Sequence, residues 1–177
     1  MWNGGLAMSS DRNIVITGFM GTGKTTVGRR VAELLNRPFI DTDEEIVRRT
    51  GRAIPDIFAH DGETNFRHIE RRMCRFLAAQ RGYVIATGGG MLVDESNLEV
   101  MLASGLVICL TATPEAIVQR LKDDPIERPL LKSDWRALLE KRREAYASIF
   151  DQVETTGKTP DEIAGEIVAI WQQTVSV

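Results

Sequence analysis

A glycine-rich segment near the start of the chain has the residue types and spacing of a phosphate-binding loop. Residues 18–25 read Gly-Phe-Met-Gly-Thr-Gly-Lys-Thr, the full pattern G-x-x-x-x-G-K-[ST]. The glycines let backbone N–H groups curl around phosphate oxygens, and a helix that begins near Lys24 directs its positive end at them. Lys24 can bridge the β- and γ-phosphates, and the Thr25 hydroxyl can bind Mg²⁺. The pattern therefore predicts a site for ATP or GTP, formed by Gly21, Thr22, Gly23, Lys24, Thr25 and Thr26.

Two carboxylates, Asp41 and Asp43, follow a second short apolar run. Because side chains alternate along a strand, both can point toward the phosphates. One can hold a water on Mg²⁺, and the other can take the proton of an attacking hydroxyl. The structural alternative makes Asp43 the N-cap of the next helix and leaves Asp41 solvated. We favour the chemical interpretation because no other predicted strand ends in Asp, which makes Asp41 the candidate acidic partner of Mg²⁺.

Three consecutive glycines, Gly88, Gly89 and Gly90, close another predicted strand. Consecutive glycines cost backbone entropy, so a packing or ligand reason is expected for them. They would let a substrate lie against the main chain and receive its N–H donors. The alternative is a loosely structured turn.

Two arginines are candidates for binding an anion. Arg142 lies on a helical stripe formed by Leu138, Arg142, Tyr146 and Ile149. A guanidinium on an inward stripe needs a buried carboxylate or an anionic ligand, unless it reaches the surface. Arg67 precedes Glu70 by three residues, so it could equally form an ordinary surface ion pair.

The elements that must position these residues alternate between strand and helix. The strands are predicted at 13–17, 38–41, 83–87 and 106–111, with an edge strand at 152–155. The helices are predicted at 24–36, 44–49, 63–80, 94–104, 114–122, 133–150 (with Ser133 as N-cap) and 160–175. On the third helix the apolar face is formed by Phe66, Ile69, Met73, Phe76 and Leu77. This order predicts an α/β fold with a mainly parallel sheet, whose ligands lie beyond the carboxyl ends of the strands.

Length and composition limit the remaining possibilities. The 177 residues fit one domain over 13–177 after a short polar tail, 1–12, that lacks the apolar segment of a signal peptide. A net charge of −3 argues against general nucleic-acid binding by a basic surface. No apolar run reaches the ~18 residues of a membrane span. Cys74 and Cys109 are predicted to be buried small hydrophobes, which fits a cytoplasmic protein, and we expect a monomer.

Taken together, these segments resemble the shikimate kinase family over about Asn13 to Trp171. The resemblance rests on the phosphate loop followed in order by D-T-D at 41–43, G-E-T-N-F-R at 62–67, G-G-G at 88–90, R-P-L-L at 128–131 and K-R-R-E-A-Y at 141–146. It implies a three-layer fold like that of nucleoside monophosphate kinases, with a five-stranded parallel sheet, a substrate-binding region and a lid at about 122–133. The implied activity is transfer of the γ-phosphoryl of ATP to the 3-hydroxyl of shikimate, with Mg²⁺.

The resemblance also implies roles for particular residues. For the acceptor, Asp43 would bind the hydroxyls and act as the base, and Asp41 would lie in the water shell of Mg²⁺. The implied acceptor site is completed by Phe58, Phe66, Arg67, Gly88, Gly89, Gly90 and Arg142. Arg128 would reach from the lid to the transferring phosphate, and would be catalytic together with Lys24 and Asp43. The implied neighbours of the adenine are Arg120, Lys158 and Pro160.

Three other functions remain as alternatives. A gluconate-kinase-like small-molecule kinase would share the phosphate loop, but we would not expect D-T-D, G-G-G and R-P-L-L in this order. A nucleotide-binding module without catalysis would be expected to lose Lys24, Asp43 or the arginines. A nucleoside monophosphate kinase would need a base-recognition pocket, for which the sequence offers no candidate.

Overall fold

A parallel sheet organises the molecule. The computed structural model describes residues 11–122 and 134–175. Within these residues, five strands form one sheet in the order β2-β3-β1-β4-β5, and every neighbouring pair is parallel. The strands are β1 (Asn13–Gly18), β2 (Phe39–Asp41), β3 (Val84–Ala86), β4 (Gly105–Thr111) and β5 (Asp151–Glu154). The predicted α/β fold with a five-stranded parallel sheet is therefore confirmed, and each strand lies within one residue of its predicted bounds.

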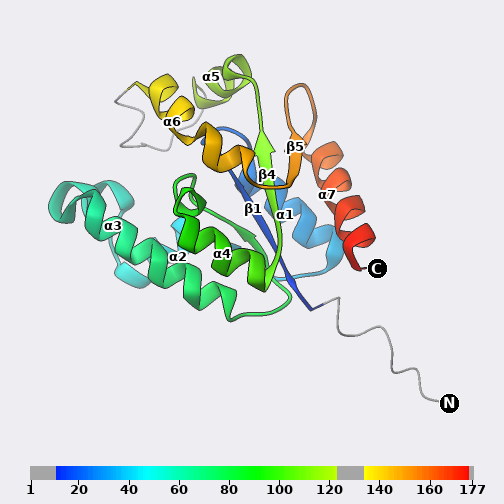
Figure 1. The fold of residues 1–177 in the computed structure, drawn as a ribbon, viewed down its shortest axis with the longest axis horizontal. Coiled ribbons are helices and arrows are strands. Elements are labelled where there is room, and N and C mark those ends of the chain that lie inside the picture. The colour runs from blue at the N-terminus through cyan, green and yellow to red at the C-terminus, as the bar shows by residue number, and fades with distance from the viewer. Residues whose placement is uncertain (1–10, 123–133, 176–177) are drawn as a thin grey trace.

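Helices cover both faces of this sheet (Figure 1). The helices are α1 (Lys24–Leu35), α2 (Thr42–Thr50), α3 (Ile54–Ala78), α4 (Glu95–Ser104), α5 (Pro114–Lys122), α6 (Trp135–Ala147) and α7 (Pro160–Val175), with a 3₁₀ turn η1 (Met91–Val93) before α4. Along β1, Ile14 and Ile16 belong to one core with α1 and α7, whereas Val15 belongs to the opposite core with α2, α3 and α4. Because successive side chains of a strand point to opposite faces, the sheet packs against helices on both sides, which gives three layers: helices, sheet and helices.

The third predicted helix is longer than expected. Helix α3 begins at Ile54 rather than Glu63, and Gly62 interrupts it with a φ of 78°. A glycine in this conformation hides the first two turns from a search for continuous periodicity. The placement of Phe76 on the buried face was wrong: its side chain is 41% exposed. The Arg49 guanidinium covers it instead, 3.8 Å from the ring centroid.

The helix that carries Arg142 is shorter than expected. Helix α6 starts at Trp135, and its N-cap is Asp134, whose carboxylate accepts hydrogen bonds from the backbone of Arg136 and Ala137. The predicted cap, Ser133, lies outside the described residues, as does the predicted lid apart from Lys122. An Asp satisfies the free N–H groups of a helix start as well as a Ser does, which explains the shift by one position.

The two cysteines are buried, as predicted. Burial raises the pKa of the Cys74 thiol to about 12 and that of Cys109 to about 11. Both are therefore unreactive thiols of the core at neutral pH. Across the described ranges, no helix combines the length and apolar character that crossing a membrane requires.

Candidate active site

The phosphate loop connects β1 to α1 at the carboxyl edge of the sheet. Gly23 is the N-cap of α1 with a φ of 92°, and no side chain caps the helix. The first turn also contains no acidic residue. The N–H groups at this helix start are therefore available to phosphate oxygens, which the helix dipole also attracts. Lys24 Nζ lies in the same loop and donates to the Phe19 carbonyl oxygen at 2.9 Å.

Asp41 lies where this loop meets the next strand. Its Oδ2 accepts a 2.6 Å hydrogen bond from the Thr25 hydroxyl, and its Oδ1 accepts from the backbone N–H of Asp43 and of Glu44. Asp41 is thus the N-cap of α2, a role that the structural alternative gave to Asp43. One hydroxyl and one carboxylate beside a phosphate loop are the oxygen donors that Mg²⁺ takes together with phosphates and water. The residues present therefore fit a Mg²⁺ ion.

The three glycines lie against the charged side chains of the site. A Cβ at Gly88 would lie 2.6 Å from Asp43 Oδ1. A Cβ at Gly90 would lie 2.5 Å from Arg67 Nη1 and 3.1 Å from Arg142 Nη2. Larger residues would displace these groups, which gives the glycines a packing reason. The segment is not a loose turn, because Thr42 Oγ1 accepts from the Gly88 N–H at 2.8 Å.

Arg142 enters the site from α6. Its side chain is buried, with 5% exposure, so it does not reach the surface. No ion pair between described residues includes it; its guanidinium carbon lies 6.0 Å from the Phe19 ring centroid. The prediction that Arg142 faces inward is confirmed. A buried guanidinium needs negative charge nearby: the Glu70 carboxylate supplies part of it, and an anionic ligand could supply more.

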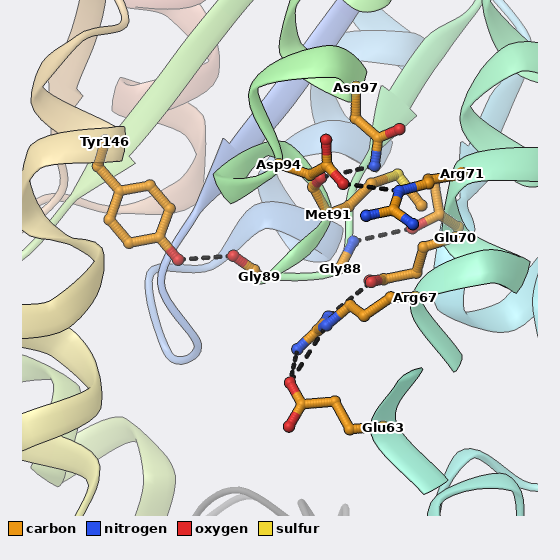
Figure 2. A network of polar contacts seen from close by, with 11 residues as sticks. Glu63, Arg67, Glu70, Arg71, Gly88, Gly89, Met91, Asp94, Asn97 and Tyr146 are labelled. Carbon is orange, nitrogen blue, oxygen red and sulfur yellow. Dashed lines mark hydrogen bonds and ion pairs between the residues drawn. The ribbon is translucent and has the colours of Figure 1, made fainter. Parts of the chain in front are cut away.

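Arg67 enters the site from α3, as Figure 2 shows. It pairs with Glu63 at 2.8 Å and with Glu70 at 2.5 Å. Arg67 and Glu70 are three residues apart, the spacing of an ordinary surface ion pair on a helix. Glu70 is only 2% exposed, however, so this pair is buried. The structure thus brings Arg67, Arg142 and Asp43 together around the glycine segment.

Glu70 is the residue of the site that the sequence interpretation missed. Burial raises the pKa of its carboxyl to about 7, and the negative charge of Asp43 acts in the same direction; Arg67 and Arg142 act against both. The signal was present in the sequence, because Phe66, Glu70, Met73 and Leu77 follow helical spacing and place a carboxylate on the apolar face of α3.

Two aromatic rings flank the Arg67 side of the site. The ring centroids of Phe58 and Phe66 lie 4.7 Å apart, on either side of the break at Gly62. The Arg67 guanidinium carbon lies 5.6 Å from the Phe66 centroid. The two predicted wall residues are therefore brought together beside Arg67.

The predicted adenine residues are only partly brought together. Arg120 donates to the carbonyl oxygens of Gly21 and Thr155 and to the Thr155 hydroxyl, and so ties the phosphate loop to the segment after β5. Pro160 lines a groove of about 330 Å³ next to Thr25 and Thr26. Lys158 instead pairs with Glu166 at 2.7 Å. Arg128 lies outside the described residues.

Comparison with known proteins shows which family this chain belongs to. The family model described as shikimate kinase matches residues 20–172. The chain belongs to the shikimate kinase family. The shikimate kinase of Geobacter sulfurreducens is 44% identical over 170 residues, covering 93% of each chain. That of Desulforudis audaxviator is 45% identical over 148 residues, 84% of this chain and 78% of its own.

Solved structures agree with this membership. The structure titled shikimate kinase from Acinetobacter baumannii in complex with shikimate has a TM-score of 0.86 and 37% identity, and the match covers 94% of this chain and 96% of that one. A gluconokinase from Sinorhizobium meliloti has a TM-score of 0.60 at 18% identity, with 93% and 94% covered, which shows a shared fold alone. The resemblance drawn from the sequence is confirmed, and the chain is an ATP-dependent kinase of the shikimate kinase family.

Proposed function

We propose that this kinase transfers the γ-phosphoryl group of ATP to the 3-hydroxyl of shikimate, with Mg²⁺, to give shikimate 3-phosphate. The observation that carries the proposal is the pair of guanidinium groups, from α3 and α6, on one glycine segment beside a carboxylate. Shikimate is a cyclic triol with one carboxylate. Its charged end and its hydroxyls match these two kinds of group.

Arg67, Arg142 and the glycine backbone bind the carboxylate in this proposal. Arg142 supplies a buried positive charge, and Arg67 reaches the same segment from the opposite helix. Among the described residues, the N–H groups of Gly89 and Gly90 donate no hydrogen bond to the protein. They are the donors that the acceptor carboxylate would use. Two charged contacts from different elements fix the orientation of the ring, with Phe58 and Phe66 at its side.

Asp43 holds the reacting hydroxyl and takes its proton. Its carboxylate lies over Gly88. Its backbone N–H donates to Asp41, which also accepts from the Thr25 hydroxyl of the phosphate loop. Lys24 and the N–H groups of α1 stabilise the charge on the phosphates, and Arg128 would add to them. Thr25, and Asp41 through a water, would hold Mg²⁺, which would supply positive charge to the phosphates.

The adenine would lie near Arg120 and Pro160. Arg120 fixes the loop after β5 against the phosphate loop, and the groove lined by Pro160 continues from Thr26. This arrangement supports a nucleotide that extends from the phosphates toward α7. Lys158 is the least supported of these neighbours because its charge is already paired. A monomer located in the cytoplasm stays a prediction.

The test is ADP release measured in parallel with shikimate, gluconate and AMP as acceptors. We expect turnover with shikimate and only background release with the other two. Arg143→Lys is a suitable control variant because Arg143 is an exposed neighbour of Arg142 on α6. Turnover with gluconate at a rate equal to or above that with shikimate would overturn the proposal, and so would turnover with AMP alone.

A further inference from the structure

Tyr146 joins helix α6 to the glycine segment. Its side chain is 7% exposed, and its hydroxyl donates a 2.6 Å hydrogen bond to the carbonyl oxygen of Gly89 (Figure 2). Tyr146 follows Arg142 by four residues, so both side chains lie on the same face of α6. One helix therefore places a guanidinium beside the glycine segment and also donates a hydrogen bond to the main chain of that segment.

The bond to Gly89 fixes a peptide plane. A peptide group is planar, so the carbonyl oxygen of Gly89 and the N–H of Gly90 turn together and point in opposite directions. With glycine on both sides, no Cβ restricts this plane. Gly90 lies between the two arginines, since its Cβ position is 2.5 Å from Arg67 Nη1 and 3.1 Å from Arg142 Nη2. The direction of the Gly90 N–H is thus set beside both guanidinium groups.

The neighbouring peptides are held by other groups. Thr42 Oγ1 accepts from the Gly88 N–H, and the Gly88 carbonyl accepts from the Met91 N–H at 3.1 Å. The Gly90 carbonyl accepts from the Val93 N–H at 3.3 Å. Of the contacts between described residues, the Tyr146 hydroxyl is the one that holds the Gly89 carbonyl. Removing this hydroxyl would therefore free one peptide while its neighbours stay in place.

The hydroxyl keeps its donor role across the physiological pH range. Burial raises the pKa of Tyr146 to about 12, although the charge of Arg142 and a hydrogen bond from its side chain to the phenol act in the opposite direction. The phenol is therefore protonated at neutral pH. Its buried position also means that loss of the bond leaves the Gly89 carbonyl without this partner in a poorly solvated place.

We propose that Tyr146 is a positioning residue for the carboxylate of the acceptor, acting through the Gly89–Gly90 peptide. This inference rests on the proposed function. The hydroxyl locks α6 to the glycine segment, so that the Arg142 guanidinium and the Gly90 N–H keep one spacing. The Gly89–Gly90 peptide is then already ordered before the substrate binds, so that binding does not bear the entropy cost of fixing it.

The first test compares Tyr146→Phe with Tyr83→Phe. Tyr83 is the other of the two tyrosines in the chain, and no hydrogen bond between described residues involves its hydroxyl, which makes it the matched control. We expect Tyr146→Phe to raise the KM for shikimate roughly 5- to 20-fold, the effect of one lost hydrogen bond in a buried site. The KM for ATP should stay at the wild-type value, as should both constants of Tyr83→Phe.

An acceptor analogue without the carboxylate separates positioning from general damage. Tyr146→Phe should change the KM for this analogue little, because the freed peptide serves only the carboxylate. An equal penalty for shikimate and analogue, a matching rise in the KM for ATP, or an unchanged KM for shikimate would each overturn the inference. Absence of shikimate turnover in the wild type would instead overturn the proposed function, and this inference with it.

A second measurement keeps the inference testable if Tyr146→Phe does not fold. Biosynthetic 3-fluorotyrosine in a Tyr83→Phe background gives one fluorine reporter, at Tyr146. Its ¹⁹F resonance should move when shikimate is added and stay in place when the analogue without carboxylate is added. A resonance that ignores shikimate under saturating conditions would contradict the proposed coupling.

Discussion

The phosphate-binding region and the acceptor region are built in different ways. The first is one stretch of chain, β1, the loop and the start of α1, and its donors are mainly backbone N–H groups at a helix start. The second takes Asp43 from α2, Arg67 and Glu70 from α3, the glycines after β3 and Arg142 from α6. Local sequence therefore specifies the first region, whereas the sheet topology assembles the second.

Asp41 connects the two regions. One carboxylate oxygen binds the Thr25 hydroxyl, and the other caps the helix that carries Asp43. The two regions also touch where the Arg142 guanidinium lies 6.0 Å from the Phe19 ring, but the groups proposed to bind each substrate come from different elements. Substitutions in one region should therefore change the constants for one substrate and leave those for the other largely unchanged. Substitutions on either side of this division test it directly.

Replacing Lys24 with alanine should have the largest effect. Lys24 serves charge rather than packing: its Nζ lies at the phosphate loop, where it donates to the Phe19 carbonyl oxygen. We expect turnover to fall by roughly 10²–10³-fold or more, as on loss of a group that stabilises developing charge. Circular dichroism should show an unchanged fold, and calorimetry should show unchanged affinity for shikimate. Lys141→Ala, at an exposed position on α6, is the control; near-wild-type turnover in folded Lys24→Ala would contradict the assignment.

This difference in construction explains what the sequence could and could not predict. The strands and the phosphate loop were predicted to within one residue, because β-branched runs and a contiguous glycine pattern are local signals. The inward position of Arg142 also followed from the local stripe on its helix. The start of α3 was missed because Gly62 breaks the helical pattern, and Asp134 replaced Ser133 as a cap of nearly equal strength.

The contacts of the acceptor region required the three-dimensional structure. Glu70 looked like a surface partner of Arg67, because spacing along one helix does not reveal which residues of other helices cover it. That the glycines let a substrate lie against the main chain stays a prediction; the sequence did not show that Asp43, Arg67 and Arg142 lie where side chains at Gly88 and Gly90 would be. Nothing within residues 88–90 indicates that α6 supplies a hydroxyl to them. Such pairings depend on long-range packing, which periodicity does not encode.

Replacing Asp43 with asparagine should have the next largest effect. The substitution keeps the shape but removes both the charge and the proton acceptor. We expect turnover to fall by roughly 10²–10⁴-fold, the usual contribution of a positioned base. Shikimate binding should weaken while ATP affinity changes little, as measured by calorimetry with each ligand. Asp56→Asn, on an exposed turn of α3, is the control. Loss of ATP affinity with intact shikimate affinity would mean that Asp43 belongs to the phosphate-binding region and not to the acceptor region.

Replacing Arg142 with lysine tests how the acceptor carboxylate is recognised. Lysine keeps the charge but loses the planar fork of the guanidinium. We expect the KM for shikimate to rise by the equivalent of roughly 1–3 kcal/mol, with the KM for ATP almost unchanged. An analogue without the carboxylate should be a poor substrate for the wild type, and the substitution should harm it far less. Equal penalties for both compounds, with Arg143→Lys as control, would mean that Arg142 does not bind the carboxylate.

Replacing Glu70 with glutamine should change how stability depends on pH. Because burial raises the pKa of Glu70 from 4.5 to about 7, the unfolded chain releases this proton at lower pH than the folded protein does. This group therefore makes the free energy of unfolding fall as pH rises from about 4.5 to about 7. Urea unfolding at pH 5, 6 and 7 should show this slope in the wild type and a smaller one in Glu70→Gln. An identical slope in both proteins would contradict the raised pKa.

The smallest predicted effect is proton uptake when shikimate binds, and it sharpens the division between the regions further. A carboxylate placed beside Arg67 and Arg142 brings negative charge toward Glu70 and raises its pKa again, so binding near pH 7 should take up a fraction of one proton. The affinity for shikimate should consequently increase as pH falls from 8 to 6, by less than about tenfold, the equivalent of one pKa unit. Calorimetry in buffers of different ionisation enthalpy measures this uptake directly.

Glu70→Gln should abolish the proton uptake, whereas Glu63→Gln, which removes the exposed partner of Arg67, should leave it in place. ATP binding should show no such difference between the variants, because the charged groups that act on Glu70 are Arg67, Arg142 and Asp43 of the acceptor region. The same uptake in Glu70→Gln would assign the proton to another group.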